Sequence, residues 1–504
     1  MADILDQIIA RRKEDYERLG PTFGSVIPQN RERAVCSFLK ENGAILEIKR
    51  ASPSKGDIAP DLDPVALARS YGEAGARNVS VLTEMRYFKG SLDDLVLVSS
   101  RFPALSFLRK DFILYEDEIE VSFRAGADAV LLIARILDEK TLRSLAARCR
   151  SFGMTPFIEV REGEDVAKLT AAAKDGFLVA GVNSRDLATF RTDLLVPALL
   201  RTSLPCRTIF ESGARNEGTC RFARQIGFDG ILIGEAVAKN PQAAAGLVKS
   251  FLSAKPDWVG HFWRQIARRK NERRPLVKIC GFTRVEDALF AASLGADVLG
   301  FVFAPSPRET KVSCVRETSA ALDKLYGTAT SRSTLPAPTT ERPLMVGVVV
   351  DAVSPQAENA FALVCAGILD AIQYQGDHPE RDLPLIDAAG GGYGIGRYTV
   401  VRLGGDEDLE RLDALTGSGE PRVLVDARVE GIAGGTGKTI PRSLVKKAGE
   451  RSPLWLAGGL GPANVRSCIE AFDPELIDAS SALESEAGIK DQVLLKAFFR
   501  EIDR

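Results

Sequence analysis

Two opposite charges close an apolar segment in the most informative stretch of the sequence, residues 44–56. Glu47 and Lys49 are two positions apart, so on a β-strand both side chains point to the same side. Pairing them there avoids the cost of burying a lone charge. The loop that follows offers hydroxyl and cationic groups that suit a phosphate, namely Ser52, Ser54 and Lys55. We interpret this stretch as the floor of an active site; the alternative is a solvated edge strand with a surface turn.

Histidine contributes little to the available chemistry. The only two histidines, His261 and His378, do not lie at the end of an apolar run. Acid–base chemistry must therefore come from Lys, Glu, Asp or Cys side chains with shifted pKa values. The eight cysteines form no CxxC pair, which argues against zinc and redox dithiol sites and fits a reducing cytoplasm.

Length and composition narrow the class of protein. A chain of 504 residues exceeds one ordinary core and predicts two or three domains. The formal net charge of -2 gives no basic field for nucleic acid. No apolar run reaches the roughly 18 residues of a membrane span, and the first residues show no secretory signal. We expect a cytoplasmic protein whose partners are small molecules.

A repeating pattern places the candidate residues on strands. Eight short apolar runs, each followed by an amphipathic stretch, occupy residues 45–49, 79–84, 105–111, 129–133, 155–160, 178–183, 207–213 and 230–234. Continuous apolar runs are typical of strands buried on both faces. Eight β/α units predict a closed parallel (β/α)8 barrel, which with its charged N-terminal helical extension forms a domain over residues 1–255.

The pattern then repeats. Residues 256–275 read as a basic linker, for which a solvated helix is favoured over a nucleic-acid contact. Eight further runs span residues 276–280, 298–303, 344–350, 371–373, 399–403, 422–426, 454–458 and 476–479. The fold prediction is thus an α/β protein of two tandem TIM barrels, the second over residues 276–504. Its Ser/Thr/Pro-rich segment, residues 327–343, is predicted to be a mobile surface insertion.

In such barrels the site lies at the C-terminal ends of the strands. In the first barrel five of the eight strands bring ionisable groups to this mouth, and the candidate residues at the strand ends include Lys110, Glu159, Asn183, Arg185 and Ser212. A purely structural barrel would not need buried charges there, because they are costly unless paired. Backbone amides near the last two strands predict a phosphate site at Gly213, Gly234 and Glu235.

These motifs together resemble indole-3-glycerol-phosphate synthase: residues 47–56, 109–112, 183–187 and 211–213. The resemblance implies conversion of 1-(2-carboxyphenylamino)-1-deoxyribulose 5-phosphate to indole-3-glycerol phosphate, with loss of CO2 and water and without a metal or organic cofactor. It implies that Lys110 is the general acid, that Lys49 holds the substrate carboxylate and that Glu159 handles the dehydration proton. Glu47, Asn183 and Ser212 would orient these groups, and Arg185 would contact the anthranilate end.

The second barrel offers a different pair of groups. Cys280 ends the first strand beside Lys278 and Arg284, whose charges favour a thiolate, although a buried Cys is usually only a small apolar residue. Asp426 ends the sixth strand, so the two form a candidate base–acid pair across one barrel mouth. Residues 433–439 nearly match a P-loop, but Ile432 stands where its first glycine is required, and a glycine-rich lid fits better. A second phosphate site is predicted at Gly458, Gly459, Ser480 and Ser481.

These pieces resemble phosphoribosylanthranilate isomerase over residues 276–504. The resemblance implies an Amadori rearrangement of N-(5'-phosphoribosyl)anthranilate, with Asp426 as general acid, Cys280 as general base and Arg308 on the anthranilate. Two departures occur: Gln375 stands where the family commonly has His, and Ala482 where it commonly has Gly. We interpret both as peripheral to the acid–base pair, with an effect on substrate affinity.

The product implied for the second barrel is the substrate implied for the first. This predicts a bifunctional enzyme of tryptophan biosynthesis, monomeric, with diffusion between two separate sites. The alternatives are a phosphosugar-binding regulatory protein without catalysis, and a fusion in which only the first barrel is active. All four principal candidates, Lys110, Glu159, Cys280 and Asp426, are reactive residue types, which favours catalysis over the first alternative.

Overall fold

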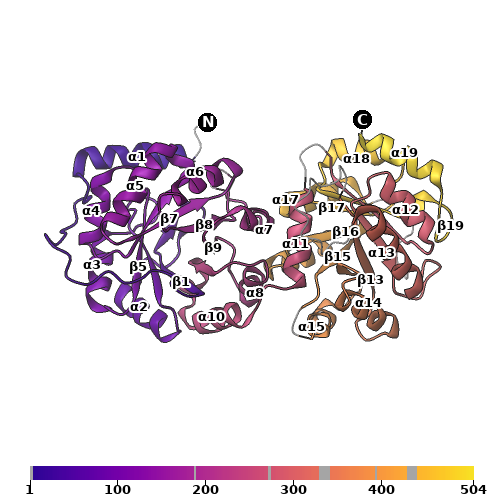
Figure 1. The fold of residues 1–504 in the computed structure, drawn as a ribbon, viewed down its shortest axis with the longest axis horizontal. Coiled ribbons are helices and arrows are strands. Elements are labelled where there is room, and N and C mark those ends of the chain that lie inside the picture. Colours follow the sequence, from indigo (N-terminus) through magenta and orange to yellow (C-terminus); the bar gives the residue numbers. More distant parts are fainter. Residues whose placement is uncertain are drawn as a thin grey trace. The chain divides into compact units, whose positions relative to one another are not determined.

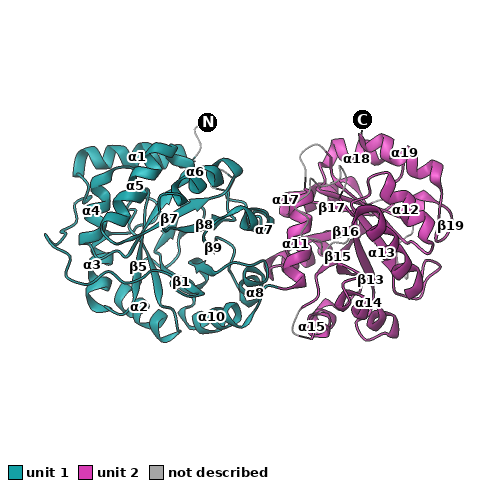
Figure 2. Cartoon of the chain, in the orientation of Figure 1, with its two compact units in different colours: residues 1–256 teal, residues 257–504 magenta. Residues whose placement is uncertain are grey.

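The computed structural model describes residues 4–186, 189–270, 274–327, 341–391, 394–427 and 440–503. The chain divides into two compact units, residues 1–256 and 257–504 (Figure 2). Each unit contains a closed barrel of eight parallel strands surrounded by helices (Figure 1). The prediction of two tandem (β/α)8 barrels is confirmed.

The first barrel follows the predicted runs closely. Its strands are β1 (Gly43–Ile48), β4 (Asn78–Leu82), β5 (Ser106–Lys110), β6 (Ala129–Ile133), β7 (Thr155–Val160), β8 (Val179–Asn183), β9 (Arg207–Glu211) and β10 (Gly230–Ile233). Its helices are α1 (Ile4–Leu19), α2 (Pro64–Glu73), α3 (Leu92–Arg101), α4 (Glu116–Arg124), α5 (Glu139–Ser151), α6 (Gly163–Ala173), α7 (Leu195–Leu200), α8 (Glu217–Gln225), α9 (Glu235–Lys239) and α10 (Ala244–Ser253). A short hairpin, β2 (Ala51–Ser52) and β3 (Gly56–Asp57), follows β1.

The interior of this barrel is apolar at the middle of the strands and charged at the mouth formed by their C-terminal ends. Ile45, Leu108, Phe157 and Ile209 belong to one buried cluster, together with residues of β6, β8 and β10. Because side chains alternate along a strand, the residue two positions further on points the same way. That position carries a charged group on β1, β5, β7 and β9: Glu47, Lys110, Glu159 and Glu211.

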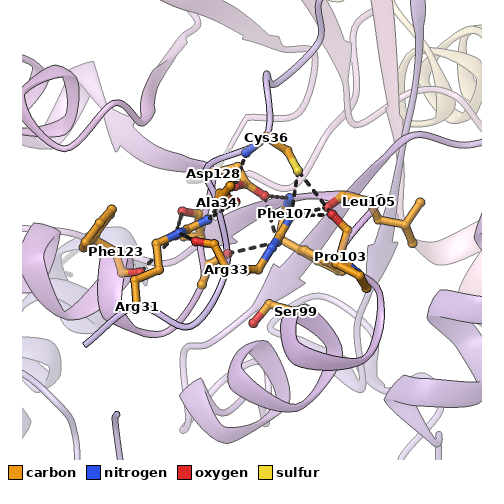
Figure 3. A network of polar contacts seen from close by, with 12 residues as sticks. Arg31, Arg33, Ala34, Cys36, Ser99, Pro103, Leu105, Phe107, Phe123 and Asp128 are labelled. Atoms are coloured by element: carbon orange, nitrogen blue, oxygen red, sulfur yellow. Dashed lines mark hydrogen bonds and ion pairs between the residues drawn. The ribbon is translucent and has the colours of Figure 1, made fainter. Parts of the chain in front are cut away.

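The N-terminal extension contacts both ends of this barrel. In α1, Leu5 and Ile8 join the buried cluster that includes Phe112, just beyond the C-terminal end of β5. Further along, Arg31 and Arg33 reach the opposite end, where both guanidinium groups pair with Asp128 immediately before β6 (Figure 3).

Asp128 accepts four hydrogen bonds in this network. Arg31 and Arg33 donate to its two oxygens at 2.7 and 3.0 Å, and the backbone N–H groups of Cys36 and Phe107 donate at 2.8 and 2.9 Å (Figure 3). A buried carboxylate with paired charges and full hydrogen bonding is the arrangement that burial of ions requires. The extension is thereby fixed to the strands that carry the site.

The second barrel also matches its predicted runs. Its strands are β11 (Leu276–Cys280), β12 (Val298–Val302), β13 (Leu344–Val349), β14 (Ala371–Tyr374), β15 (Arg397–Leu403), β16 (Val423–Ala427), β17 (Trp455–Leu456) and β18 (Leu476–Ala479). Its helices are α11 (Trp258–Arg269), α12 (Val285–Ser293), α13 (Val312–Tyr326), α14 (Pro355–Cys365), α15 (Pro379–Ala389), α16 (Glu407–Gly417), α17 (Arg442–Arg451), α18 (Val465–Phe472) and α19 (Gln492–Asp503). A hairpin, β19 (Glu484–Glu486) and β20 (Ile489–Lys490), precedes α19.

Helix α11 lies within the segment read as a linker and packs on the second barrel. Its Phe262 stacks on Tyr398 of β15 with ring centroids 6.1 Å apart, and its Trp263 lies 5.9 Å from Trp455 of β17. Most of the predicted insertion, residues 328–340, and the glycine-rich stretch 433–439 lie outside the described residues. Among the helices that the structure describes, none is long and apolar enough to cross a bilayer.

Candidate active sites

Lys110 occupies the centre of the mouth of the first barrel. Its Nζ lies 3.3 Å from Glu159 Oε2 and 2.9 Å from Glu211 Oε2. Burial alone would lower the pKa of this ammonium, but the carboxylates of Glu211, Glu159 and Glu47 outweigh it and raise the pKa above its ordinary value. Lys110 is therefore held in the protonated form that a proton donor needs.

The residues on either side of Lys110 point the opposite way. Arg109 and Asp111 are buried in the helical layer, where they pair with each other at 3.1 Å. Arg12 of α1 completes this cluster by pairing with Asp111 at 3.0 Å and with Glu118 of α4 at 2.6 Å. These charges hold α1 against the barrel and do not join Lys110.

Glu211, which begins the motif 211–213, is a site residue to which we assigned no role from the sequence. Burial raises its pKa to about 7, and the charge of Lys110 lowers it only in part. Its Oε1 atom is buried without a hydrogen-bond partner. A Cβ at Gly181 of β8 would stand 1.9 Å from that oxygen, so the glycine leaves room for the carboxylate. The signal was present in the sequence, because Glu211 lies two positions after the inward-facing Ile209.

Glu47 and Lys49 form the pair expected from their spacing. Lys49 Nζ lies 3.3 Å from Glu47 Oε1 and 5.4 Å from the centre of the Phe88 ring. The other oxygen of Glu47, Oε2, is buried without a partner. A Cβ at Gly234 would lie 2.3 Å from Glu47 Oε1, so this predicted phosphate residue also makes space for the carboxylate.

Asn183 and Arg185 link the mouth to the loop after β1. The Asn183 side-chain amide donates to Glu159 Oε1 at 3.1 Å, and its oxygen accepts from the backbone N–H of Arg185 at 3.0 Å. The Arg185 guanidinium in turn donates to Ser54 Oγ at 3.2 Å. In the same loop, the Ser52 hydroxyl is buried without a partner and Lys55 is exposed.

The turn after β9 is strained. Ser212 has a φ of +60°, in the left-handed region that costs a non-glycine residue free energy. The Ser184 hydroxyl holds this turn by donating to the backbone oxygens of Glu211 at 2.8 Å and Ser212 at 2.5 Å. Next to it, a Cβ at Gly213 would stand 2.8 Å from both Leu194 and Phe210, so the tight packing requires glycine.

Glu235 differs from the other predicted phosphate residues. It begins α9, and its carboxylate pairs with Lys239 of the same helix at 2.8 Å. A side-chain carboxylate would repel a phosphate, so any part that Glu235 plays in phosphate binding falls to its backbone N–H.

Burial and Lys278 have opposite effects on the thiol of Cys280 in the second barrel. Burial raises the pKa of its thiol, and Lys278 lowers it only in part. Lys278 is itself engaged by Asp478 of β18, with Nζ 2.5 Å from Oδ2. Arg284 pairs with Asp287 at 2.7 Å. Lys278 thus favours the thiolate, as expected, but burial outweighs it, and Arg284 pairs with Asp287.

Asp426 of β16 faces the same interior as Cys280. Burial raises the pKa of Asp426. The charge of Asp478 raises, and that of Lys278 lowers, the pKa of both Asp426 and Cys280. A raised pKa keeps a carboxyl group protonated closer to neutral pH, as a general acid requires.

Gln375, just beyond the end of β14, contacts Asp426 directly. Its side-chain amide donates to Asp426 Oδ2 at 3.0 Å. Our interpretation of this departure from the family pattern as peripheral was wrong. The two residues are 51 positions apart in the chain, and only the closed barrel brings their strand ends together. The second departure from the family pattern is Ala482, whose methyl group packs against Gly461. A Cβ added to Gly461 would lie 2.9 Å from the Cβ of Ala482.

Arg308 is fixed by an acidic partner. It pairs with Glu484, with Nε and Nη2 at 3.0 and 2.9 Å from Oε2. Lys490 binds the other oxygen of Glu484 at 2.7 Å and donates to the backbone oxygen of Cys280 at 2.5 Å. The hairpin that carries Glu484 and Lys490 thus packs against the end of β11.

The predicted phosphate residues of the second barrel lie at the ends of β17 and β18. Gly458 and Gly459 have φ of +98° and +63°, a conformation that favours glycine. Ser480 donates its hydroxyl to the backbone oxygen of Cys280 at 2.9 Å, and Ser481 begins the short 3-10 turn that follows.

Comparison with known proteins matches each barrel to a family. The family model of indole-3-glycerol phosphate synthase matches residues 7–249, and that of N-(5'phosphoribosyl)anthranilate (PRA) isomerase matches residues 277–501. The indole-3-glycerol phosphate synthase of Rippkaea orientalis is 34% identical over 49% of this chain and 89% of that protein. The crystal structure of phosphoribosyl anthranilate isomerase from Thermotoga maritima shares 30% sequence identity, covering 45% of this chain and 98% of that chain, with a TM-score of 0.36.

A longer relative contains both parts. The multifunctional tryptophan biosynthesis protein of Phycomyces blakesleeanus is 33% identical and aligns with 92% of this chain. The alignment covers 63% of that relative, so the chain spans less than two thirds of its length. The chain belongs to the indole-3-glycerol phosphate synthase family through its first barrel and to the phosphoribosylanthranilate isomerase family through its second.

Proposed function

We propose that the chain catalyses two consecutive steps of tryptophan biosynthesis. The second barrel isomerises N-(5'-phosphoribosyl)anthranilate to 1-(2-carboxyphenylamino)-1-deoxyribulose 5-phosphate. The first barrel converts that product to indole-3-glycerol phosphate with loss of CO2 and water. The observation that carries the proposal is the cluster at the first mouth, where Lys110 lies within 3.3 Å of both Glu159 and Glu211.

In the first barrel, Lys110 protonates the ketone oxygen of the substrate as the ring carbon attacks. Glu159 takes the proton that is lost during dehydration, and Asn183 orients its carboxylate through the hydrogen bond to Oε1. Lys49 holds the substrate carboxylate, with Glu47 fixing its ammonium. Arg185 and the loop that carries Ser54 contact the anthranilate end and the phosphate. The buried, partnerless oxygens of Glu47 and Glu211 are free to accept substrate hydroxyl groups.

In the second barrel, Asp426 protonates the furanose oxygen so that the ring opens to a Schiff base. Cys280 removes the C2' proton to give an enolamine, which becomes the aminoketone by gaining a proton at C1' and losing the proton of the C2' hydroxyl. The buried ion pair of Lys278 and Asp478 lies near both groups and balances charge as the proton moves. Phosphate binds at the glycine turn of β17 and the amides after β18, and Arg308 contacts the anthranilate.

Complementation tests the proposal. The chain should restore tryptophan-free growth to a strain lacking the synthase and, separately, to a strain lacking the isomerase. Growth only of the first strain would leave the second barrel inactive and refute the bifunctional assignment. The same chain should work without added metal or organic cofactor, and its eight free thiols support a reducing cytoplasm as its compartment.

A further inference from the structure

A line of hydrogen bonds crosses the interior of the second barrel and ends on Asp426. The Tyr398 hydroxyl donates to Gln373 Oε1 at 2.8 Å, and Gln373 Nε2 donates to Gln375 Oε1 at 2.7 Å. Gln375 Nε2 then donates to Asp426 Oδ2 at 3.0 Å. All four residues are buried. The line therefore joins three strands, β14, β15 and β16, through direct hydrogen bonds between buried side chains.

In all three hydrogen bonds of this line, the donor lies on the Tyr398 side and the acceptor on the Asp426 side. The carboxyl group of Asp426 accepts the hydrogen bond from Gln375 at Oδ2, which an ionised carboxylate requires and which a protonated one still permits, so Gln375 turns its amide nitrogen toward Asp426. Its oxygen then needs a donor, which Gln373 supplies, and the oxygen of Gln373 is satisfied in turn by Tyr398. Successive hydrogen bonds that point the same way polarise and strengthen one another. Tyr398 thus supplies the donor that completes the line and supports this orientation of both amides.

The far end of the line rests on a rigid aromatic layer. The ring of Tyr398 lies 5.1 Å from that of Trp455 at an angle of 77°, and it stacks on Phe262 of α11. Aromatic packing of this kind restricts the rotamers of a buried side chain. The helix that follows the first unit is therefore part of the support for the line.

We propose that Gln375, oriented by Gln373 and Tyr398, is the positioning residue of Asp426 in the isomerase reaction. This inference rests on the proposed function of the second barrel. Gln375 occupies one lone pair of Asp426 Oδ2, while the backbone N–H of Ala427 holds Oδ1 at 2.8 Å. The carboxyl group is thereby held in one orientation, in which it can present its proton to the substrate.

The line also sets the proton affinity of Asp426. A donor to the carboxylate favours the ionised form, so loss of Gln375 should raise the pKa of Asp426 further. The other groups that face Asp426 act from β18 and β11: Asp478 raises the pKa, and Lys278 lowers it. Arg402, the register partner of Asp426 on β15, is paired with Asp377.

The decisive experiment measures isomerase kcat, KM and the pH profile of kcat for full-length variants. Gln375→Met keeps the length of the side chain and removes the donor; a hydrogen bond to a charged group is worth about tenfold or more in rate. We expect kcat to fall about tenfold with little change in KM, and the loss of activity at high pH to move upward by about one pH unit. Tyr398→Phe should act in the same direction but more weakly, since it removes only the orienting donor.

A histidine at position 375 provides the rescue. Its imidazole restores a donor at neutral pH, so Gln375→His should recover most of the lost kcat and add an ionisation near pH 6.5. A purely packing role for Gln375 would produce neither effect.

Tyr374 is the matched control because it lies on the same strand and points outward, where its hydroxyl donates to Asp382 at 2.6 Å. Tyr374→Phe should leave kcat and the pH profile unchanged. Synthase activity in the same sample measures the amount of folded first unit. All three tryptophans, Trp258, Trp263 and Trp455, belong to the second unit, so their emission reports its integrity.

Two results separate the failure of this inference from that of the proposed function. Wild-type kcat and pH profile in Gln375→Met, with Asp426→Asn inactive, would overturn the positioning role alone. Absence of isomerase activity from the wild-type chain would overturn the proposed function, and this inference with it.

Discussion

The ammonium of Lys110 lies 2.9 Å from the carboxylate of Glu211, closer than its 3.3 Å approach to Glu159. Both partners are almost fully enclosed at the mouth of the first barrel, and Glu211 Oε1 has no hydrogen-bond donor. A buried pair with an unsatisfied oxygen is a poor stabiliser, because desolvation offsets the attraction. The arrangement therefore costs stability at the place where the proposed chemistry needs charge.

We predict that Glu211→Gln makes the first unit more stable at alkaline pH. Burial raises the pKa of Glu211 from 4.5 to about 7 in the folded chain. A raised pKa in a folded acid gives stability that is complete below the unfolded value and is lost as the pH rises through the folded value. The wild type should thus lose up to roughly 3 kcal/mol between pH 4.5 and 7, and the variant should not.

Urea unfolding at pH 5 and pH 8, followed by far-UV circular dichroism, measures this difference. Tryptophan emission, which reports only the second unit, gives the reference transition in the same sample. Glu164→Gln, an exposed change on α6, is the control and should follow the wild type. Equal pH dependence in Glu211→Gln and the wild type would contradict the assignment of the raised pKa to Glu211.

Lys110→Ala should separate the two activities. The change removes the proposed proton donor, and loss of a principal acid typically lowers the rate by about 10²–10⁴-fold. Synthase activity, measured as indole-3-glycerol phosphate formed from the isolated ketose substrate, should fall by that factor while isomerase activity stays near wild type. Lys140→Ala, at an exposed position on α5, should change neither. A fall of less than threefold, or loss of both activities in a folded protein, would refute the role.

Asp426→Asn should do the reverse. The amide keeps the shape of the side chain and cannot donate a carboxylic proton, so isomerase activity should drop by about 10²–10⁴-fold. Supplying the ketose substrate directly should bypass the defect and restore formation of indole-3-glycerol phosphate. Asp413→Asn on α16, whose carboxylate pairs with Arg451 at the surface, is the matched control. Residual isomerase activity above one third of wild type would rule out Asp426 as general acid.

Strand periodicity is what made the barrels and much of each mouth predictable from sequence. Glu47 and Lys49, two positions apart, do pair at the end of β1, because alternation is a local property. The error over Gln375 has the opposite origin. Its contact with Asp426 links β14 to β16, and no local pattern shows which strand ends meet across a closed barrel. The environment of Cys280 was also unpredictable, since burial and the pairing of Lys278 with Asp478 depend on strands some 200 residues apart.

The attachment of the N-terminal extension leads to a last prediction. Asp128 holds Arg31, Arg33 and the backbone of Cys36 against the start of β6 (Figure 3). Asp128→Asn removes the charge and leaves two buried guanidinium groups without it, and breaking a buried pair typically costs about 3–5 kcal/mol. The urea transition of the first unit should therefore move to lower concentration while the tryptophan-reported transition stays in place. Asp175→Asn breaks an exposed pair with Arg143 and should have little effect. If the two variants unfold at the same urea concentration, the network around Asp128 does not anchor the extension. The position of α1 at the C-terminal end of the barrel must then depend on Arg12 and on the apolar contacts of Leu5 and Ile8 alone.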